Sequence, residues 1–372
     1  MNQTTVSDFD VSSTVRYESS TFNDTNDKVV PFLPFNDVIV AVVATFLILF
    51  LILGFFGNLL TILVIVKSTK LRNIFNQFIL SLCVSDLFSA SVSWVNLYRR
   101  TWGFNVFVPP NFFCWFYWGA DMWTSCVTSQ HILGFAILRL ISVWKPVRFS
   151  KIKPLHGRIW IVLIWVVGFL CGFIPFAFFS GAKIRDRSDR TSPTARWPSC
   201  TQNQETLEIY SRYIEYAYPI FFYFPLAAIA LVSVGIGIVI VRKRAHMSRA
   251  RTSSDPSKAV KERQKEKQAI LQLGLIVGSF MLGYIPFTVY EFWTLNNKDT
   301  SLEGWKREWM FGTAQYICLR FSECLNPVFY NLASTKMRKE TKKFLKGLDC
   351  RNAGSKGRAA SSASSVDTGL EL

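Results

Sequence analysis

The 372-residue sequence is 50% hydrophobic, with 33 Phe and 12 Trp, and its mean hydropathy is +0.23. This composition excludes an ordinary soluble domain and indicates a membrane protein. A formal net charge of +17 is compatible with nucleic-acid binding until the positions of the basic residues are considered.

Seven apolar stretches are long enough to cross a bilayer, which takes about 20 helical residues. The predicted spans are 37–66, 74–98, 112–144, 158–179, 211–241, 268–294 and 309–332. Residues 1–36 are polar and lack the basic start and short apolar core of a signal peptide, so the first span is expected to insert uncleaved. We expect an all-α membrane protein: a seven-helix bundle (37–332), an amphipathic helix (333–350) and a disordered tail (351–372).

The distribution of Lys and Arg predicts the orientation of the chain in the membrane. These residues concentrate in the loops after the first, third and fifth spans and in the tail, and 242–267 alone carries 10. Because basic loops stay on the cytosolic side, the N-terminus is expected outside the plasma membrane. Two glycosylation sequons, at Asn2 and Asn23, precede the first span and agree with this orientation. Nucleic-acid binding is excluded, since the basic excess lies beside the membrane.

Polar side chains inside the predicted spans are the functional candidates, because lipid penalises them. Arg139 lies in the apolar stretch GFAILRLISVW (134–144), and Asp86 lies in LSLCVSDL (80–87). The last span closes with NPVFY (326–330), just before the amphipathic helix, and Cys114 stands 25 residues before Arg139. In this order and spacing, residues 37–346 resemble the rhodopsin-like family of G protein-coupled receptors.

The resemblance implies a disulfide between Cys114 and Cys200, both near predicted extracellular ends of spans. It also implies partners on the cytosolic side: a heterotrimeric G protein, arrestin and receptor kinases. Arg139 matches the family's G protein-contacting arginine, with Glu266 as its inactive-state partner. The other switch positions are Pro327 and Tyr330, and Cys350 is a palmitoylation candidate. Leu138 departs from the family pattern, which has an acid immediately before that arginine.

A polar core in mid-membrane is a further implication of the resemblance. In the family a sodium ion commonly sits among such carboxylate and hydroxyl oxygens, which are hard ligands. A sodium ion is therefore an expected allosteric modulator, and a water-filled network without an ion is the alternative. The matching residues are Asn58, Asp86, Thr128, Ser322, Glu323 and Asn326.

The expected ligand is an extracellular small molecule. Asp121 precedes Arg139 by 18 residues, five full helical turns, so both face inward. In amine receptors the position of Asp121 binds the ligand's ammonium, which implies a cationic ligand. Arg320 stands where opsins carry the retinal-binding lysine, so a photopigment is not expected. The predicted pocket residues are Asp121, Ser125, Tyr218, Tyr284, Phe287, Thr288, Glu291, Tyr316 and Arg320.

Arg320 leaves several interpretations of this pocket open. It is expected to pair with Asp121 or to reach Glu323, one turn further along its own helix. The pair with Asp121 is then a packing salt bridge, or the ligand is a zwitterion whose carboxylate binds Arg320 instead of a simple amine. The predicted function is a receptor that activates G proteins. The alternatives are a constitutively active or ligand-independent receptor and a seven-helix transporter. An enzyme is not expected, because the spans hold no metal-ligand cluster or activated nucleophile.

Overall fold

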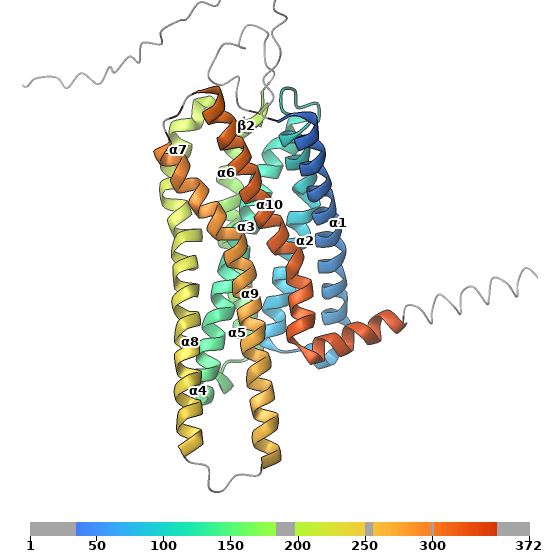
Figure 1. The fold of residues 1–372 in the computed structure, drawn as a ribbon, viewed down its shortest axis with the longest axis vertical. Coiled ribbons are helices and arrows are strands. Elements are labelled where there is room, and N and C mark those ends of the chain that lie inside the picture. The colour runs from blue at the N-terminus through green and yellow to red at the C-terminus, as the bar shows by residue number, and fades with distance from the viewer. Residues whose placement is uncertain (1–34, 184–197, 250–255, 298, 300, 348–372) are drawn as a thin grey trace, which may run out of the picture.

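The structure is a computed structural model that describes residues 35–183, 198–249, 256–297, 299 and 301–347. Its described part is a bundle of long helices that lie side by side (Figure 1). The α-helices are α1 (Asp37–Lys67), α2 (Ile74–Arg100), α3 (Asn111–Trp144), α4 (Pro146–Ser150), α5 (Pro154–Gly168), α6 (Ile174–Phe178), α7 (Leu207–Tyr218), α8 (Phe224–Arg249), α9 (Pro256–Asn296) and α10 (Leu302–Ala333). Short 3₁₀ turns at η1 (Thr69–Leu71) and η5 (Gln204–Thr206) join neighbouring elements.

Six of the described helical stretches are long and apolar enough to cross a membrane. They are Asp37–Lys67, Ile74–Arg100, Asn111–Trp144, Pro154–Phe178, Gln204–Arg242 and Ile270–Thr294. The seventh predicted span lies in α10, which packs against α9 and α1 but is not among these six. Arg320, Glu323 and Asn326 make α10 more polar, and all three are buried in the bundle. The fold is therefore an all-α membrane protein, in which six apolar spans and α10 are bundled together within the described residues.

Two of the spans contain a π-helical turn, and each turn is followed by a proline. The turn η2 (Phe169–Phe173) joins α5 to α6 ahead of Pro175, and η6 (Pro219–Tyr223) joins α7 to α8 ahead of Pro225. A proline in a helix has no N–H to donate and its ring crowds the carbonyl four residues earlier. For Pro175 that carbonyl belongs to Cys171, and the hydroxyl of Tyr213 donates a hydrogen bond to it. The wider turn thus accommodates the proline and ties α7 to η2.

Polar side chains cap the helices at several of their first turns. Asn36 accepts a hydrogen bond from the N–H of Ile39 at 2.9 Å, and Asn73 accepts one from Asn76 at the same distance. Ser301 caps α10 through Gly304, at 3.0 Å. These side chains satisfy N–H groups that a helix leaves unpaired at its start.

A two-stranded antiparallel hairpin covers one end of the bundle, which we call the hairpin end. Its strands are β1 (Ser180–Ala182) and β2 (Cys200–Gln202), with Gly181 opposite Thr201. Cys200 forms a disulfide with Cys114, at the start of α3, so the bridge that the resemblance implied is present. The hairpin is thereby fixed over the bundle axis.

The centre of the bundle is α3, which contacts α2, α5, α6, α8, α9 and β1. At the end opposite the hairpin, α8 and α9 project beyond the other helices, and a further helix over 335–347 runs across the bundle (Figure 1). Met337 of this helix is buried, and Lys67 lies 5.3 Å from the ring centre of Phe344. The amphipathic helix therefore packs its apolar side against the end of α1.

Candidate functional site

A cavity of about 340 Å³ lies at the hairpin end, among α2, α3, β2, α7, α9 and α10. Its size is at the lower end of the range of small-molecule pockets, roughly 300–1,000 Å³. Predicted pocket residues that lie on its wall are Asp121, Ser125, Tyr218, Tyr284, Phe287, Glu291 and Tyr316. The structure thus gathers most of the predicted set around one space.

Two predicted pocket residues do not lie on this wall. Thr288 turns its hydroxyl back to the carbonyl of Tyr284 on its own helix, at 2.8 Å. Arg320 lies beneath the cavity, where its guanidinium is bound by carboxylates. Their place in the ligand-binding set stays a prediction, because helix position fixes the direction of a side chain but not the partner that holds it.

Arg320 is the centre of a buried ion network that joins three helices. Its Nη2 donates to the carboxylate of Asp121 on α3, and its Nη1 donates to Glu323 at 2.7 Å and to the hydroxyl of Ser89 on α2. The Ser89 hydroxyl also donates to Glu323 at 3.2 Å, and the ring of Tyr316 lies 4.7 Å from the guanidinium carbon. Both pairings that the sequence offered for Arg320 therefore exist together.

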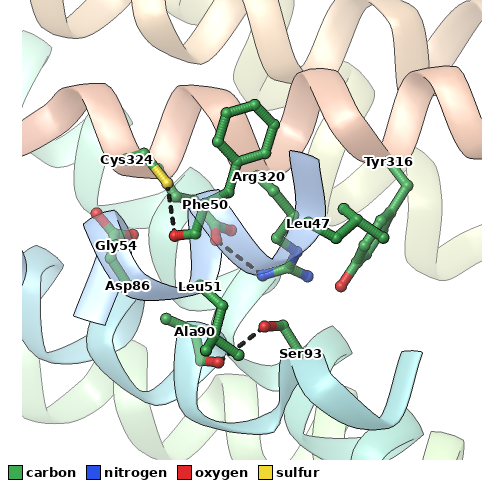
Figure 2. Close-up of a pocket in the computed structure, with 11 residues that line it drawn as sticks. Leu47, Phe50, Leu51, Gly54, Asp86, Ala90, Ser93, Tyr316, Arg320 and Cys324 are labelled. Carbon is green, nitrogen blue, oxygen red and sulfur yellow. Dashed lines mark hydrogen bonds and ion pairs between the residues drawn. The ribbon is translucent and has the colours of Figure 1, made fainter. Parts of the chain in front are cut away.

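The network borders a small space between α1, α2 and α10, which Figure 2 shows from the side of Cys324. Asp86, Arg320 and Glu323 line it, and its volume of about 10 Å³ is the size of a single water molecule. In Figure 2 the guanidinium of Arg320 extends between α10 and α2, above Ser93. Tyr316 lines both this small space and the larger cavity, whereas Arg320 lines the small space alone.

The predicted polar core lies next to the network. Asn326 donates to Asp86 at 2.8 Å, and Ser85 lies 3.2 Å from the hydroxyl of Thr128. Ser322, also in the core, accepts a hydrogen bond through its carbonyl from Ser279, at 2.9 Å. The core therefore connects α2, α3, α9 and α10 through polar side chains.

Two buried oxygens of this core have no hydrogen-bond partner among the described residues. They are Oδ1 of Asp86 and Oδ1 of Asn58. Both are hard oxygen donors, which fit a sodium ion, and a buried oxygen left without any partner costs free energy. Glu323 is already bound by Arg320, so its carboxylate is not needed for such an ion.

At the opposite end, Arg139 contacts α9 through an amide. Its Nη2 donates to Oε1 of Gln272 at 2.7 Å, and its guanidinium carbon lies 3.8 Å from the ring centre of Phe75. The predicted partner Glu266 lies on α9 six residues before Gln272, and its side chain is outside the described residues. Of the other switch positions, Pro327 lies inside α10 and Tyr330 is fully buried. Asn2, Asn23 and Cys350 also fall outside the described residues.

Several charged residues of the cavity were not predicted. Arg99 and Arg100 at the end of α2 and Glu308 on α10 lie on its wall beside Glu291. The sequence places Arg99 and Arg100 just beyond a predicted span, where arginines ordinarily contact water or lipid headgroups. Contacts of the end of α2 with β2 and α10, through Arg99 to Cys200 and Arg100 to Thr313, place both arginines on the cavity wall.

Comparison with known proteins agrees with this geometry. The family described as "7 transmembrane receptor (rhodopsin family)" matches residues 57–330. The green-sensitive opsin of Gallus gallus is 26% identical over 76% of this chain and 73% of the opsin. The growth hormone secretagogue receptor type 1 of Mus musculus is 24% identical, over 87% and 85%. A neuromedin U receptor homologue of Caenorhabditis elegans is 24% identical, over 77% and 75%. The chain belongs to the rhodopsin family of seven-transmembrane receptors.

Proposed function

We propose that this chain is a plasma-membrane receptor, with its N-terminus outside, that binds an extracellular small molecule and activates heterotrimeric G proteins. The observation that carries the proposal is the pairing of a ligand-sized cavity at one end of α3 with Arg139 towards the other. Asp121 on the cavity wall and Arg139 are 18 residues apart, which is about 27 Å along a helix. The buried polar network between them supplies the coupling that a two-state receptor needs.

The ligand that this proposal favours is an amine or a zwitterion. Asp121 faces the cavity with 21% of its side chain exposed, but its charge is already compensated by Arg320. A ligand ammonium that reaches Asp121 would therefore meet a carboxylate that Arg320 already binds. Because a simple amine gains less from such a carboxylate, a zwitterion is favoured over a simple amine. A sodium ion at the free oxygens of Asp86 and Asn58 is part of the proposal, as an allosteric modulator.

On the cytosolic side the proposal includes arrestin and receptor kinases as partners of the tail, which lies outside the described residues. A second function is favoured by Leu138 and by the internal compensation of Asp121: a receptor with high basal activity that needs no ligand. Guanine-nucleotide exchange measured without added ligand separates the ligand-activated receptor from the receptor with high basal activity.

The test is guanine-nucleotide exchange on a panel of heterotrimeric G proteins, with the full chain in nanodiscs. We expect exchange above that of empty nanodiscs, at least tenfold reduced in Arg139→Ala, because the variant loses the charged contact that Arg139 is proposed to make with the G protein, worth about 1.5–3 kcal/mol. Arg148→Ala, on the exposed surface of α4 at the same end, is the matched control and should retain exchange. Ion flux through vesicles that hold the chain, with no exchange on any G protein, would replace the receptor by a transporter.

A further inference from the structure

We infer that Arg99 and Arg100 form a carboxylate-binding subsite in the cavity and that Glu291 and Glu308 in the same cavity bind an ammonium, so that the ligand is a zwitterion. The inference rests on the proposed receptor function and places the ligand carboxylate on α2. Arg320, the position that the sequence suggested, is unsuited because two carboxylates already bind it.

Arg99 is a buried cation that forms no ion pair with any residue that the structure describes. Its side chain is 5% exposed and lies on the cavity wall, and neither it nor Arg100 forms an ion pair within the described part of the chain. The Nε donates to the carbonyl of Cys200 at 2.6 Å, and Nη1 donates to Oδ1 of Asn96 at 3.2 Å. The Nη2 donates to no described residue. A buried guanidinium that has only neutral acceptors is poorly compensated, and a carboxylate is the acceptor that suits its geometry.

Arg100 lies beside it and shares its acceptor. Its Nε donates to the same Oδ1 of Asn96, at 3.3 Å, and its Nη1 donates to the hydroxyl of Thr313 at 3.1 Å. One amide oxygen thus holds two guanidinium groups together against their mutual repulsion. An anion bound between the two guanidinium groups would remove that repulsion. A purely structural role would not require two arginines to lie this close together.

Aromatic rings surround the two guanidinium groups. The ring of Trp118 lies 4.7 Å from the guanidinium carbon of Arg99, and the ring of Trp309 lies 5.9 Å from it and 5.6 Å from that of Arg100. Such rings stabilise a desolvated cation and hold its plane in a fixed direction. The subsite is therefore preorganised, and its walls suit an aromatic ligand.

The same cavity also carries negative charges. Glu291 on α9 and Glu308 on α10 line the same cavity, and neither carboxylate is in an ion pair among the residues that the structure describes. Tyr290 lines the same cavity and interacts electrostatically with both glutamates and with both arginines. A ligand that spans this cavity meets cations on α2 and carboxylates on α9 and α10. An aromatic α-amino acid has the charges and the ring that fit.

Four related compounds test the inference, and their affinities for the purified full chain in nanodiscs are the measurement. Tryptophan carries both charges, indole-3-propionate only the carboxylate, tryptamine only the ammonium, and 3-methylindole neither. We expect tryptophan to bind at least about tenfold more tightly than any of the others, since a charged hydrogen bond contributes about 1.5–3 kcal/mol. Equal affinities for all four, or no binding by any of them, would overturn the inference.

The variants assign each charge to its wall. Arg99→Gln and Arg100→Gln should each weaken tryptophan and indole-3-propionate about tenfold and leave tryptamine unchanged. Glu308→Gln should weaken tryptophan and tryptamine only. Because Arg99 also holds the carbonyl of Cys200, Arg99→Lys keeps the charge and controls for misfolding: it should retain most of the carboxylate affinity. A uniform loss for all compounds in Arg99→Gln and Arg100→Gln contradicts the subsite.

The two proposals fail in different ways. Charge-selective binding of tryptophan by a chain that never promotes nucleotide exchange would remove the receptor function and leave the subsite. Nucleotide exchange by a chain that binds the four compounds alike would remove the subsite and leave the receptor function.

Discussion

Arg320 compensates negative charge that is buried inside the helix bundle. It is 4% exposed and forms ion pairs with both Asp121 on α3 and Glu323 on α10, so it compensates part of their combined negative charge. Removing one partner of a buried ion pair costs about 3–5 kcal/mol, because the remaining charge loses its compensation without regaining water. Arg320 is therefore expected to matter more for stability than any exposed arginine.

Arg320→Met keeps the length of the side chain and removes its charge. We predict a loss of about 3–5 kcal/mol of stability, measured as a lowered thermal midpoint in nanodiscs. The matched control is Arg212→Met, which breaks an exposed ion pair with Glu208 at 2.8 Å and should cost under about 1 kcal/mol. Combining Arg320→Met with Asp121→Asn and Glu323→Gln should recover most of the loss. Equal effects of the two arginine variants would disprove the role of Arg320.

The sequence predicts the partners of Arg320 but not their combination. Its position before Pro327 indicates the bundle interior and leaves Asp121 and Glu323 as alternatives. Both bind because a guanidinium presents five N–H donors in a fork, so Nη1 and Nη2 reach different helices. The contribution of Ser89 was not predictable, since a serine gives no charge signal and its contact depends on the rotation of α2 towards α10.

At the scale of elements, hydropathy predicts where helices cross the membrane but not where they end. The helices α8 and α9 continue to Arg249 and from Pro256, well beyond the predicted spans, because polar residues can extend a helix into water. The positions of prolines likewise do not predict the local geometry of a helix. Pro175 and Pro225 mark irregular turns, but whether a helix kinks or adds a residue depends on its neighbours.

Close approach between α3 and η2 depends on Gly119. A Cβ added there would lie 2.8 Å from the backbone carbonyl oxygen of Phe173 and 3.0 Å from the Cβ of Ala177. In α8 the space around Gly237 is open, with nothing within 4 Å of an added Cβ. The two glycines therefore differ in packing while both lie within helices.

We predict that Gly119→Ala lowers the thermal midpoint and that Gly237→Ala leaves it unchanged or raises it. Both variants gain up to about 1 kcal/mol in helix propensity, so their difference isolates the clash, which is worth about 1–3 kcal/mol. Thermal melts of the two variants beside the wild type provide the measurement. A thermal midpoint for Gly119→Ala at or above that of Gly237→Ala would show that η2 shifts to accommodate the added methyl group without loss of stability.

At the scale of the whole molecule, positions along one helix were predicted better than contacts between distant segments. The shared face and the separation of Asp121 and Arg139 follow from their spacing along one helix, whereas the roles of Cys114 and Arg139 are implied by the resemblance to the receptor family. The positive wall made by Arg99 and Arg100 was missed, since it exists only where α2, β2 and α10 meet. The charge distribution inside a bundle depends on contacts between segments far apart in the sequence.

A hydrogen bond between α3 and α9 is expected to stabilise the resting state of the receptor. Arg139 on α3 donates to Gln272 on α9 at 2.7 Å, while Leu138 supplies no charge next to it. We propose that activation moves this end of α9 outward, and this movement would break that hydrogen bond. A contact made only in the resting state biases the equilibrium by its own free energy, about 1.5–3 kcal/mol for a charged donor.

Gln272→Ala is therefore predicted to raise basal nucleotide exchange on the coupled G protein by about tenfold or more, without ligand. Gln264→Ala, on the exposed side of α9 two turns earlier, is the matched control and should leave basal exchange unchanged. Surface expression of both variants is measured in parallel, so that a change in receptor number is not taken for a change in activity. Basal exchange of Gln272→Ala at the wild-type level, with intact coupling, would mean that Arg139 is restrained by another residue, and Glu266→Ala is then the next variant to measure.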